Sequence, residues 1–316
     1  MYSQLFGLRE DPFNTTPDPR FLFLTQQHRK ALAGLTYAVL SAKRFIVLTG
    51  DIGTGKTTLL QTALRYLPET RCQCSVILNP TLTVDEALEA TLQGFGVAEI
   101  SGSKVQRLSS LGHVVQQGEL LGKVSILIVD EAHKASPQVL EEIRLLGNFE
   151  SLQIVLAGQP ELNEVLNRED LRQLKQRIAV RLSIEPLSSG EVEQYIEHRW
   201  HKAGGAGSPP FSPEALAEIV QRSDAIPRLI NSICDNALTL AYEEQASLVT
   251  ARHVSQAAAK LDIAGAGDAA DARRRNPTWQ SELVSRWRRL SIRMPLRKAS
   301  PFPAGRPGDE NARERA

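Results

Sequence analysis

Two glycines, a lysine and a threonine near residue 50 have the types and the spacing of a phosphate-binding loop. Gly50 is followed by four residues and then by Gly55, Lys56 and Thr57, which satisfies the pattern G-x-x-x-x-G-K-[ST]. Glycines let backbone N–H groups turn toward a phosphate without a Cβ clash, and a following helix adds partial positive charge at its N-terminus. Lys56 would reach the β- and γ-phosphates, and the Thr57 hydroxyl would hold Mg²⁺. The expected nucleotide-binding loop comprises Gly50, Asp51, Ile52, Gly53, Thr54, Gly55, Lys56, Thr57 and Thr58.

Two adjacent acids, Asp130 and Glu131, follow the apolar run 124–129. After a phosphate loop in the same sheet, such acids predict a Mg²⁺-holding group, here Asp130. Glu131 is placed to polarise the water that attacks the phosphate, as hydrolysis requires. A strand that merely ends in solvated acids is the alternative. Gln159 follows the next apolar run, where it either touches the γ-phosphate or its water, or caps a turn.

Arginines before the last expected strand and in a later helix are candidates for contact with phosphate. Arg177 lies in LRQLKQRIAVRL, with Arg172 and Arg181 as nearby alternatives. An arginine from a neighbouring subunit stabilises charge on a transferring phosphoryl group and can raise the rate strongly. Arg228 begins a helix in AIPRLINSICDNAL, from which it could reach bound phosphates. A solvated basic turn for Arg177 and a surface salt bridge for Arg228 are the alternatives.

These residues require an alternation of strands and helices to position them. Apolar runs predict strands at 45–48, 74–78, 124–129, 152–157 and 178–187. Helical spacing of apolar residues predicts helices at 26–42, 83–94, 103–121, 137–146 and 161–176. Strands that alternate with helices imply a parallel sheet with right-handed crossovers. The sequence therefore predicts an α/β fold.

The chain divides into four parts. Residues 1–24 mix phenylalanines with prolines, which predicts an irregular arm packed on the body. The α/β core is expected over 25–204, up to the linker signal GGAGSPP. Three helical patterns predict a small all-helical lid over 205–262. The Ala/Gly/Asp/Arg/Pro composition predicts a mostly disordered basic tail over 263–316.

The composition favours a protein of the reducing cytosol. No apolar run approaches the ~20 residues that span a bilayer, and the N-terminus does not have the pattern of a signal peptide. Cys72, Cys74 and Cys234 are too few and too ill-spaced for a disulfide framework or a zinc site. The net charge of +1 is uneven, because residues 261–316 contain 12 Lys/Arg against 7 Asp/Glu. The tail is therefore expected to contact something anionic.

Together the motifs resemble the AAA+ ATPases of the general secretion pathway A type. The resemblance rests on GDIGTGKTT, ILIVDEAH, QIVLAGQPEL, the QRI before the last strand, IPRLINSICDNAL, and the opening YSQLFGLREDPFNTTPDPRFLFLTQQHRKAL. It covers about residues 1–260 and implies a P-loop NTPase that hydrolyses ATP with Mg²⁺ and assembles into a ring or filament. It also implies that Arg177 is the arginine finger, that Arg228 is the second sensor, and that Gln159 occupies the first-sensor region.

The resemblance leaves the client system open. Related ATPases assist transposases by binding DNA, whereas secretion members continue into a transmembrane segment and a periplasmic peptidoglycan-binding domain, neither of which is recognised in this chain. We expect a cytoplasmic homo-oligomer that energises or regulates an envelope, secretion or polysaccharide export system. A DNA-bound regulator of a transposase and a nucleotide switch that hydrolyses little are the alternatives.

The tail contains a basic amphipathic segment at 278–294. Its apolar residues step by four, four, three and four and form one stripe: Trp279, Leu283, Trp287, Leu290 and Met294. A basic helix with tryptophans is typical of a segment that lies in an anionic membrane surface, which would hold the protein at the periphery of the inner membrane. Docking in a groove of a partner protein, and a disordered tail with chance spacing, are the alternatives.

Overall fold

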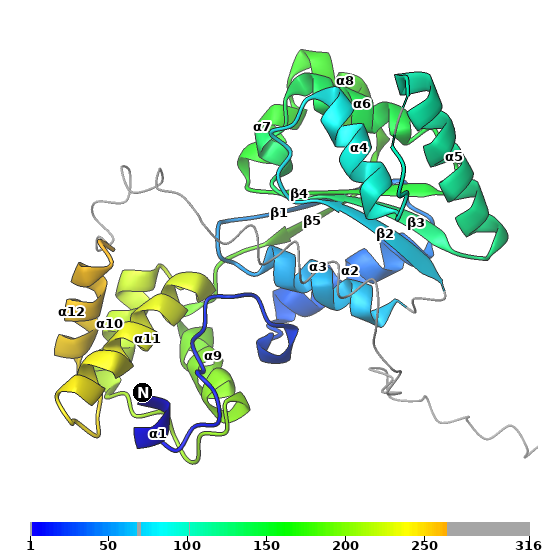
Figure 1. Ribbon diagram of the computed structural model, residues 1–316. Helices are drawn as coiled ribbons and strands as arrows, with labels where there is room; N and C mark the ends of the chain where they lie inside the picture. Colours follow the sequence, from blue (N-terminus) through cyan, green and yellow to red (C-terminus); the bar gives the residue numbers. More distant parts are fainter. Residues whose placement is uncertain (1, 68–70, 101, 264–316) are drawn as a thin grey trace, which may run out of the picture.

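A five-stranded parallel sheet lies at the centre of an α/β unit (Figure 1). The computed structural model describes residues 2–67, 71–100 and 102–263, so the tail from residue 264 on, with the amphipathic segment 278–294, lies outside the described residues. The strand order is β2-β3-β4-β1-β5, and every neighbouring pair is parallel. The strands are β1 (Phe45–Gly50), β2 (Cys72–Ile77), β3 (Val124–Val129), β4 (Leu152–Gly158) and β5 (Ile178–Ile184). The α/β fold expected from the sequence is confirmed.

The three central strands are buried over nearly their whole length. β1 and β4 are buried at every residue, and β3 at every residue but its first. Strands covered on both faces must be apolar on both faces, which is why these segments are continuous apolar runs in the sequence. The edge strand β5 instead alternates half-buried and exposed residues up to its last residue, the buried Ile184.

Helices cover both faces of the sheet, as Figure 1 shows. On one face, α2 (Gln26–Leu40) and α3 (Lys56–Tyr66) share an apolar cluster with the strands. On the other face a second apolar cluster includes residues of α4 (Val84–Gly94), α5 (Lys104–Leu120), α6 (Pro137–Leu146), α7 (Glu161–Leu166) and α8 (Arg172–Arg177). Short 3₁₀ turns lie at η1 (Pro19–Phe21), η2 (Ala132–Lys134) and η3 (Glu169–Leu171).

The single helix expected over 161–176 is broken. The chain forms α7, then extended backbone at Arg168, then η3 and α8. Leu166 and Leu171 are both buried in the same apolar cluster. In a continuous α-helix two residues five apart point about 140° from one another, whereas here the chain changes direction between the two leucines at Arg168.

Four helices and the N-terminal arm form a second unit. The helices are α9 (Ser189–Lys202), α10 (Pro213–Ser223), α11 (Pro227–Glu243) and α12 (Ala251–Lys260), and the arm adds the short helix α1 (Tyr2–Leu5). Phe13 of the arm is fully buried among apolar residues of this helical unit. Arg199 of α9 donates from Nε to the Pro12 carbonyl at 2.5 Å and from Nη2 to the Asn14 carbonyl at 3.1 Å. The arm is therefore packed mainly on the helical unit.

The sequence predicted that the α/β core extends to residue 204, which would include α9, but the apolar side chains of α9 pack with the helical unit. Val192, Ile196 and Trp200 of α9 are buried in the cluster of the helical unit, and not in those of the α/β unit. The Gly/Pro-rich segment that predicted the boundary is a loop between two helices of one unit. It folds back on α9, since a Cβ on Gly205 would lie 2.3 Å from Trp200 Nε1.

Candidate nucleotide-binding site

The strand order brings three predicted groups to one edge of the sheet. β4 lies between β1 and β3, and all three strands run in the same direction. The phosphate loop follows β1, Asp130 follows β3, and Gln159 follows β4. Ligands of open parallel sheets bind outside the carboxyl ends of the strands, so this edge is the candidate functional site.

The phosphate loop has the conformation that its glycines permit. Gly53 and Gly55 have φ of +82° and +100°, a region that residues with a Cβ rarely adopt. Lys56 opens α3 and is 6% exposed. Its Nζ donates to the carbonyls of Gly50 at 2.6 Å and Asp51 at 2.8 Å. Burial lowers the pKa of this ammonium, and the nearby charges of Asp130 and Glu131 oppose that shift.

Thr57 and Asp130 meet although they are far apart in the sequence. The Thr57 hydroxyl donates to Asp130 Oδ2 at 2.9 Å, and the Glu131 backbone N–H donates to Asp130 Oδ1 at 2.9 Å. Asp130 is 4% exposed. Burial raises the pKa of its carboxyl, and the negative charge of Glu131 raises this pKa further. The two hydrogen bonds and the positive charge of Lys56 oppose the rise. A hydroxyl and a carboxylate are hard oxygen donors, so the pair fits Mg²⁺.

Glu131 lies beside that pair in a left-handed backbone conformation. Its φ is +54°, and its carboxylate is 2.8 Å from Lys134 Nζ and 3.8 Å from His133 Nε2. The Gln159 backbone N–H donates to His133 Nδ1 at 3.3 Å, and the Gln159 amide lies 3.0 Å from His133 Nε2. Burial lowers the pKa of His133. This histidine therefore lies between Gln159 and Glu131.

The helical unit contacts the phosphate loop directly. The Arg228 backbone N–H, at the start of α11, donates to the Gly53 carbonyl at 3.3 Å. A Cβ on Gly53 would lie 2.6 Å from Arg228 Cβ and 3.1 Å from Ile226 Cγ2. The predicted nearness of Arg228 to the nucleotide loop thus has a structural basis, although the site role of Arg228 stays a prediction.

The start of α2 also contacts the loop, which the sequence did not reveal. His28 is 3% exposed, and its Nε2 lies 3.2 Å from the Thr54 carbonyl oxygen. Its Nδ1 lies 2.7 Å from the hydroxyl of Thr25, the N-cap of α2. The spacing Thr25-x-x-His28 marks a helix start, but nothing local indicates that the imidazole points at the phosphate loop.

Arg177 lies away from the other predicted residues. It ends α8 immediately before β5, whose first residue pairs with Phe45 at the start of β1. The phosphate loop follows the carboxyl end of β1, whereas Arg177 lies at the amino ends of the strands, on the opposite side of the sheet from the phosphate loop. Its Nη1 donates to the Arg144 carbonyl at 3.0 Å and to Asn148 Oδ1 at 2.8 Å. Arg181 donates to Asn163 Oδ1 at 3.0 Å.

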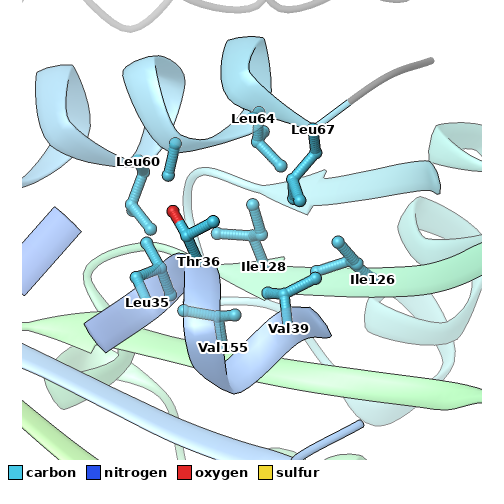
Figure 2. A pocket seen from close by; sticks show the side chains of 10 residues that line it. Leu35, Thr36, Val39, Leu60, Leu64, Leu67, Ile126, Ile128 and Val155 are labelled. Atoms are coloured by element: carbon cyan, nitrogen blue, oxygen red, sulfur yellow. The ribbon is translucent and has the colours of Figure 1, made fainter. Parts of the chain in front are cut away.

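A small gap under α2 and α3 is not a ligand site. Figure 2 shows its lining of Leu35, Thr36, Val39, Leu60, Ala63, Leu64, Leu67, Ile126, Ile128 and Val155. The gap measures ≈ 10 Å³, whereas ligand pockets measure roughly 300–1,000 Å³.

Neither a metal-binding cluster nor a membrane-spanning helix is found in the described ranges. Cys72 and Cys74 both lie in β2, and among residues 2–67, 71–100 and 102–263 no three His, Cys, Asp or Glu gather to hold a metal. Within the same ranges, no helix is long and apolar enough to cross a membrane.

Comparison with known proteins agrees with this geometry. Residues 39–166 match the family described as AAA domain. The ORC2 protein of Aeropyrum pernix has the same fold, with a TM-score of 0.64, 17% identity, and coverage of 82% of this chain and 74% of that chain. The fold is therefore that of the AAA+ P-loop NTPases.

Sequence comparison gives a more particular assignment. The chain is 39% identical over 293 residues to General secretion pathway protein A of Aeromonas hydrophila, which covers 90% of this chain and 51% of that protein. The expected similarity to the general secretion pathway A proteins is therefore confirmed, and the chain spans about half the length of this relative. An uncharacterized HTH-type transcriptional regulator of Methanocaldococcus jannaschii is 27% identical over 160 residues, 48% of this chain and 39% of that protein.

Proposed function

We propose that the protein binds and hydrolyses ATP with Mg²⁺, assembles into a homo-oligomer when ATP is bound, and energises or regulates a bacterial envelope, secretion or polysaccharide export system. The observation that carries the proposal is the contact of Thr57 with Asp130 beside the buried Lys56. The identity with General secretion pathway protein A supports the choice of client.

Each site residue has a separate task in this proposal. The loop N–H groups and Lys56 bind the phosphates, as helix N-termini and buried ammonium groups favour anions. Thr57 and Asp130 hold Mg²⁺, which when bound supplies positive charge against the phosphate oxygens. Glu131 accepts a proton from the attacking water. Gln159, in contact with His133, lies where it can orient that water.

A second subunit completes the site, because Arg177 lies at the opposite edge of its own sheet. In an assembly, the Arg177 side chain of one subunit faces the phosphate of its neighbour, while Arg228 acts on the nucleotide of its own subunit. The protein works in the cytoplasm, with the segment 278–294 as a peripheral contact on the inner membrane.

Two substitutions separate binding from hydrolysis. Lys56→Ala removes the phosphate-binding ammonium and is expected to abolish ATP binding. Glu131→Gln retains the shape but not the base, so ATP binding persists and turnover falls by a factor on the order of 10²–10⁴. Calorimetry with ATP, phosphate release and light scattering measure binding, turnover and assembly, with the exposed Glu119→Gln as the matched control. Wild-type turnover by Glu131→Gln would contradict the proposal.

Mixed assemblies test whether Arg177 acts on the neighbouring subunit. Lys56→Ala and Arg177→Ala are each expected to be inactive alone. A mixture of the two contains interfaces with an intact Lys56 on one side and an intact Arg177 on the other, so phosphate release is expected to recover in part. If mixing restores nothing while light scattering shows that hybrids form, Arg177 does not act in trans.

Binding of DNA is the second candidate function. One relative's name, HTH-type transcriptional regulator, supports it. The test is retention of Glu131→Gln on duplex DNA at ~150 mM salt, with and without ATP, since phosphate contacts weaken steeply as salt rises. Retention that requires ATP favours a DNA-bound regulator of a transposase, whereas assembly without retention favours the envelope system.

A further inference from the structure

His28 connects the start of α2 to the backbone of the phosphate loop. The imidazole lies between the Thr25 hydroxyl, 2.7 Å from Nδ1, and the Thr54 carbonyl oxygen, 3.2 Å from Nε2. The Thr25 hydroxyl also accepts the His28 backbone N–H at 3.2 Å. Thr25 and His28 are 5% and 3% exposed, so the contacts are shielded from water. A Cβ on Gly55 would lie 3.7 Å from Nε2, which places the ring against the loop itself.

The partners of the two ring nitrogens determine the tautomer. A carbonyl oxygen only accepts hydrogen bonds, so Nε2 must carry the proton that it shares with Thr54. Thr25 can then donate its hydroxyl proton to Nδ1 while its oxygen accepts the backbone N–H of His28. Burial lowers the pKa of His28, which favours this neutral form over the imidazolium.

The hydrogen bond to Thr54 fixes the direction of the next N–H group. No cis peptide bond occurs in the described part of the chain, so the Thr54 carbonyl and the Gly55 N–H point in opposite directions across a trans peptide. The carbonyl points to His28, and the Gly55 N–H therefore points away from α2. Gly55 is the N-cap of α3, with φ of +100°, a conformation that residues with a Cβ rarely adopt. A donor on the carbonyl also polarises the peptide and strengthens its N–H as a donor.

We propose that His28 is a positioning residue for nucleotide binding, which holds the Thr54–Gly55 peptide so that the Gly55 N–H faces the phosphates. This inference rests on the nucleotide site proposed above. By this inference the start of α2 influences phosphate affinity, although His28 lies 26 residues before Thr54 in the sequence. His28 itself touches no phosphate.

Two substitutions of His28 separate the two ring contacts. Glutamine can place its amide nitrogen where Nε2 lies, whereas the shorter asparagine reaches only as far as Nδ1. His28→Gln is therefore expected to keep the donor to Thr54, and His28→Asn to lose it. Both lose the buried ring, so their thermal unfolding temperatures without nucleotide are expected to fall by similar amounts.

The assay is calorimetric binding of Mg·ADP and of inorganic tripolyphosphate to the full chain. Loss of one hydrogen bond corresponds to about fivefold weaker binding. His28→Asn is expected to bind both ligands about fivefold more weakly than the wild type, and His28→Gln within about twofold. An equal loss for tripolyphosphate, which has no base, supports an effect on phosphate. Equal dissociation constants for the two variants, or a loss confined to ADP, would overturn the inference.

Failure of the inference about His28 and failure of the proposed function give different results. A wild-type protein that binds neither ligand contradicts the nucleotide site, whereas a binding wild type with equal variants contradicts only the role of His28. Should His28→Asn not fold, the ¹⁵N chemical shifts of the wild-type imidazole test the geometry directly. A protonated Nε2 and an unprotonated Nδ1 support the inference, and the opposite tautomer refutes it.

Discussion

Gly53→Ala tests whether α11 is packed on the phosphate loop as closely as the structure indicates. Alanine at φ of +82° costs about 1–2 kcal/mol of conformational strain. The added Cβ would lie 2.6 Å from Arg228 Cβ, which cannot move without moving the helix. Overpacking of this kind typically costs about 1–3 kcal/mol. The free energy of unfolding is therefore expected to fall by about 2–5 kcal/mol in urea titrations.

Gly96→Ala is the matched control for the conformational strain of alanine at a positive φ. Gly96 has φ of +86°, and a Cβ there would have nothing within 4 Å. Its free energy of unfolding is expected to fall by only about 1–2 kcal/mol. The difference between the two variants measures the contact between α11 and the loop. Equal losses of stability for Gly53→Ala and Gly96→Ala would refute the close packing of Arg228 on Gly53.

Three further substitutions test the roles of single side chains. His133→Phe removes the ring nitrogens that contact Gln159, so steady-state phosphate release should fall up to about tenfold, because one lost hydrogen bond costs about 1 kcal/mol. The dissociation constant for ATP should stay within about twofold, and a wild-type rate of phosphate release would contradict the role of this contact. Arg199→Met leaves two arm carbonyls without their donor, at a cost of about 1–3 kcal/mol each, and limited trypsin digestion should cleave residues 1–24 faster than in the wild type. Burial lowers the pKa of His198, so the unfolded state binds its proton more readily and stability declines as pH falls below about 6.5. His198→Phe should therefore raise the melting temperature more at pH ~5.5 than at pH ~7.5, and an equal gain at both would show that protonation of His198 does not contribute.

The groups that could be predicted from the sequence are those whose signal is local. The phosphate loop lies in one run of nine residues, 50–58, and Asp130 and Glu131 follow a single apolar run. Central strands are apolar on both faces, so β1, β3 and β4 were predictable within one or two residues. Thr83 and Ser212 cap helix starts with their side chains, and such a cap depends only on residues within one turn of the helix.

Contacts between distant segments had no local signal. His28 lies in an ordinary helical pattern, and its role depends on how α2 packs beside α3. The pairing of His133 with Gln159 depends on β4 lying next to β3, which alternation of strands and helices does not specify. The unit on which α9 packs has no local signal either. A Gly/Pro-rich segment such as 204–210 predicts a loop, but only tertiary contacts tell whether that loop divides two units.

The carbonyl groups of the phosphate loop show how three parts of the chain act on one short segment. Lys56 donates to the carbonyls of Gly50 and Asp51, α11 donates to that of Gly53, and His28 lies on that of Thr54. A phosphate that draws Lys56 away removes the hydrogen bonds to Gly50 and Asp51, whereas the contacts at Gly53 and Thr54 come from other elements and need not change. Displacing α11 from the loop, in contrast, takes away the donor of Gly53 at the point where the backbone is already left-handed. Movement of the helical unit would therefore change the hydrogen bonding of the loop backbone.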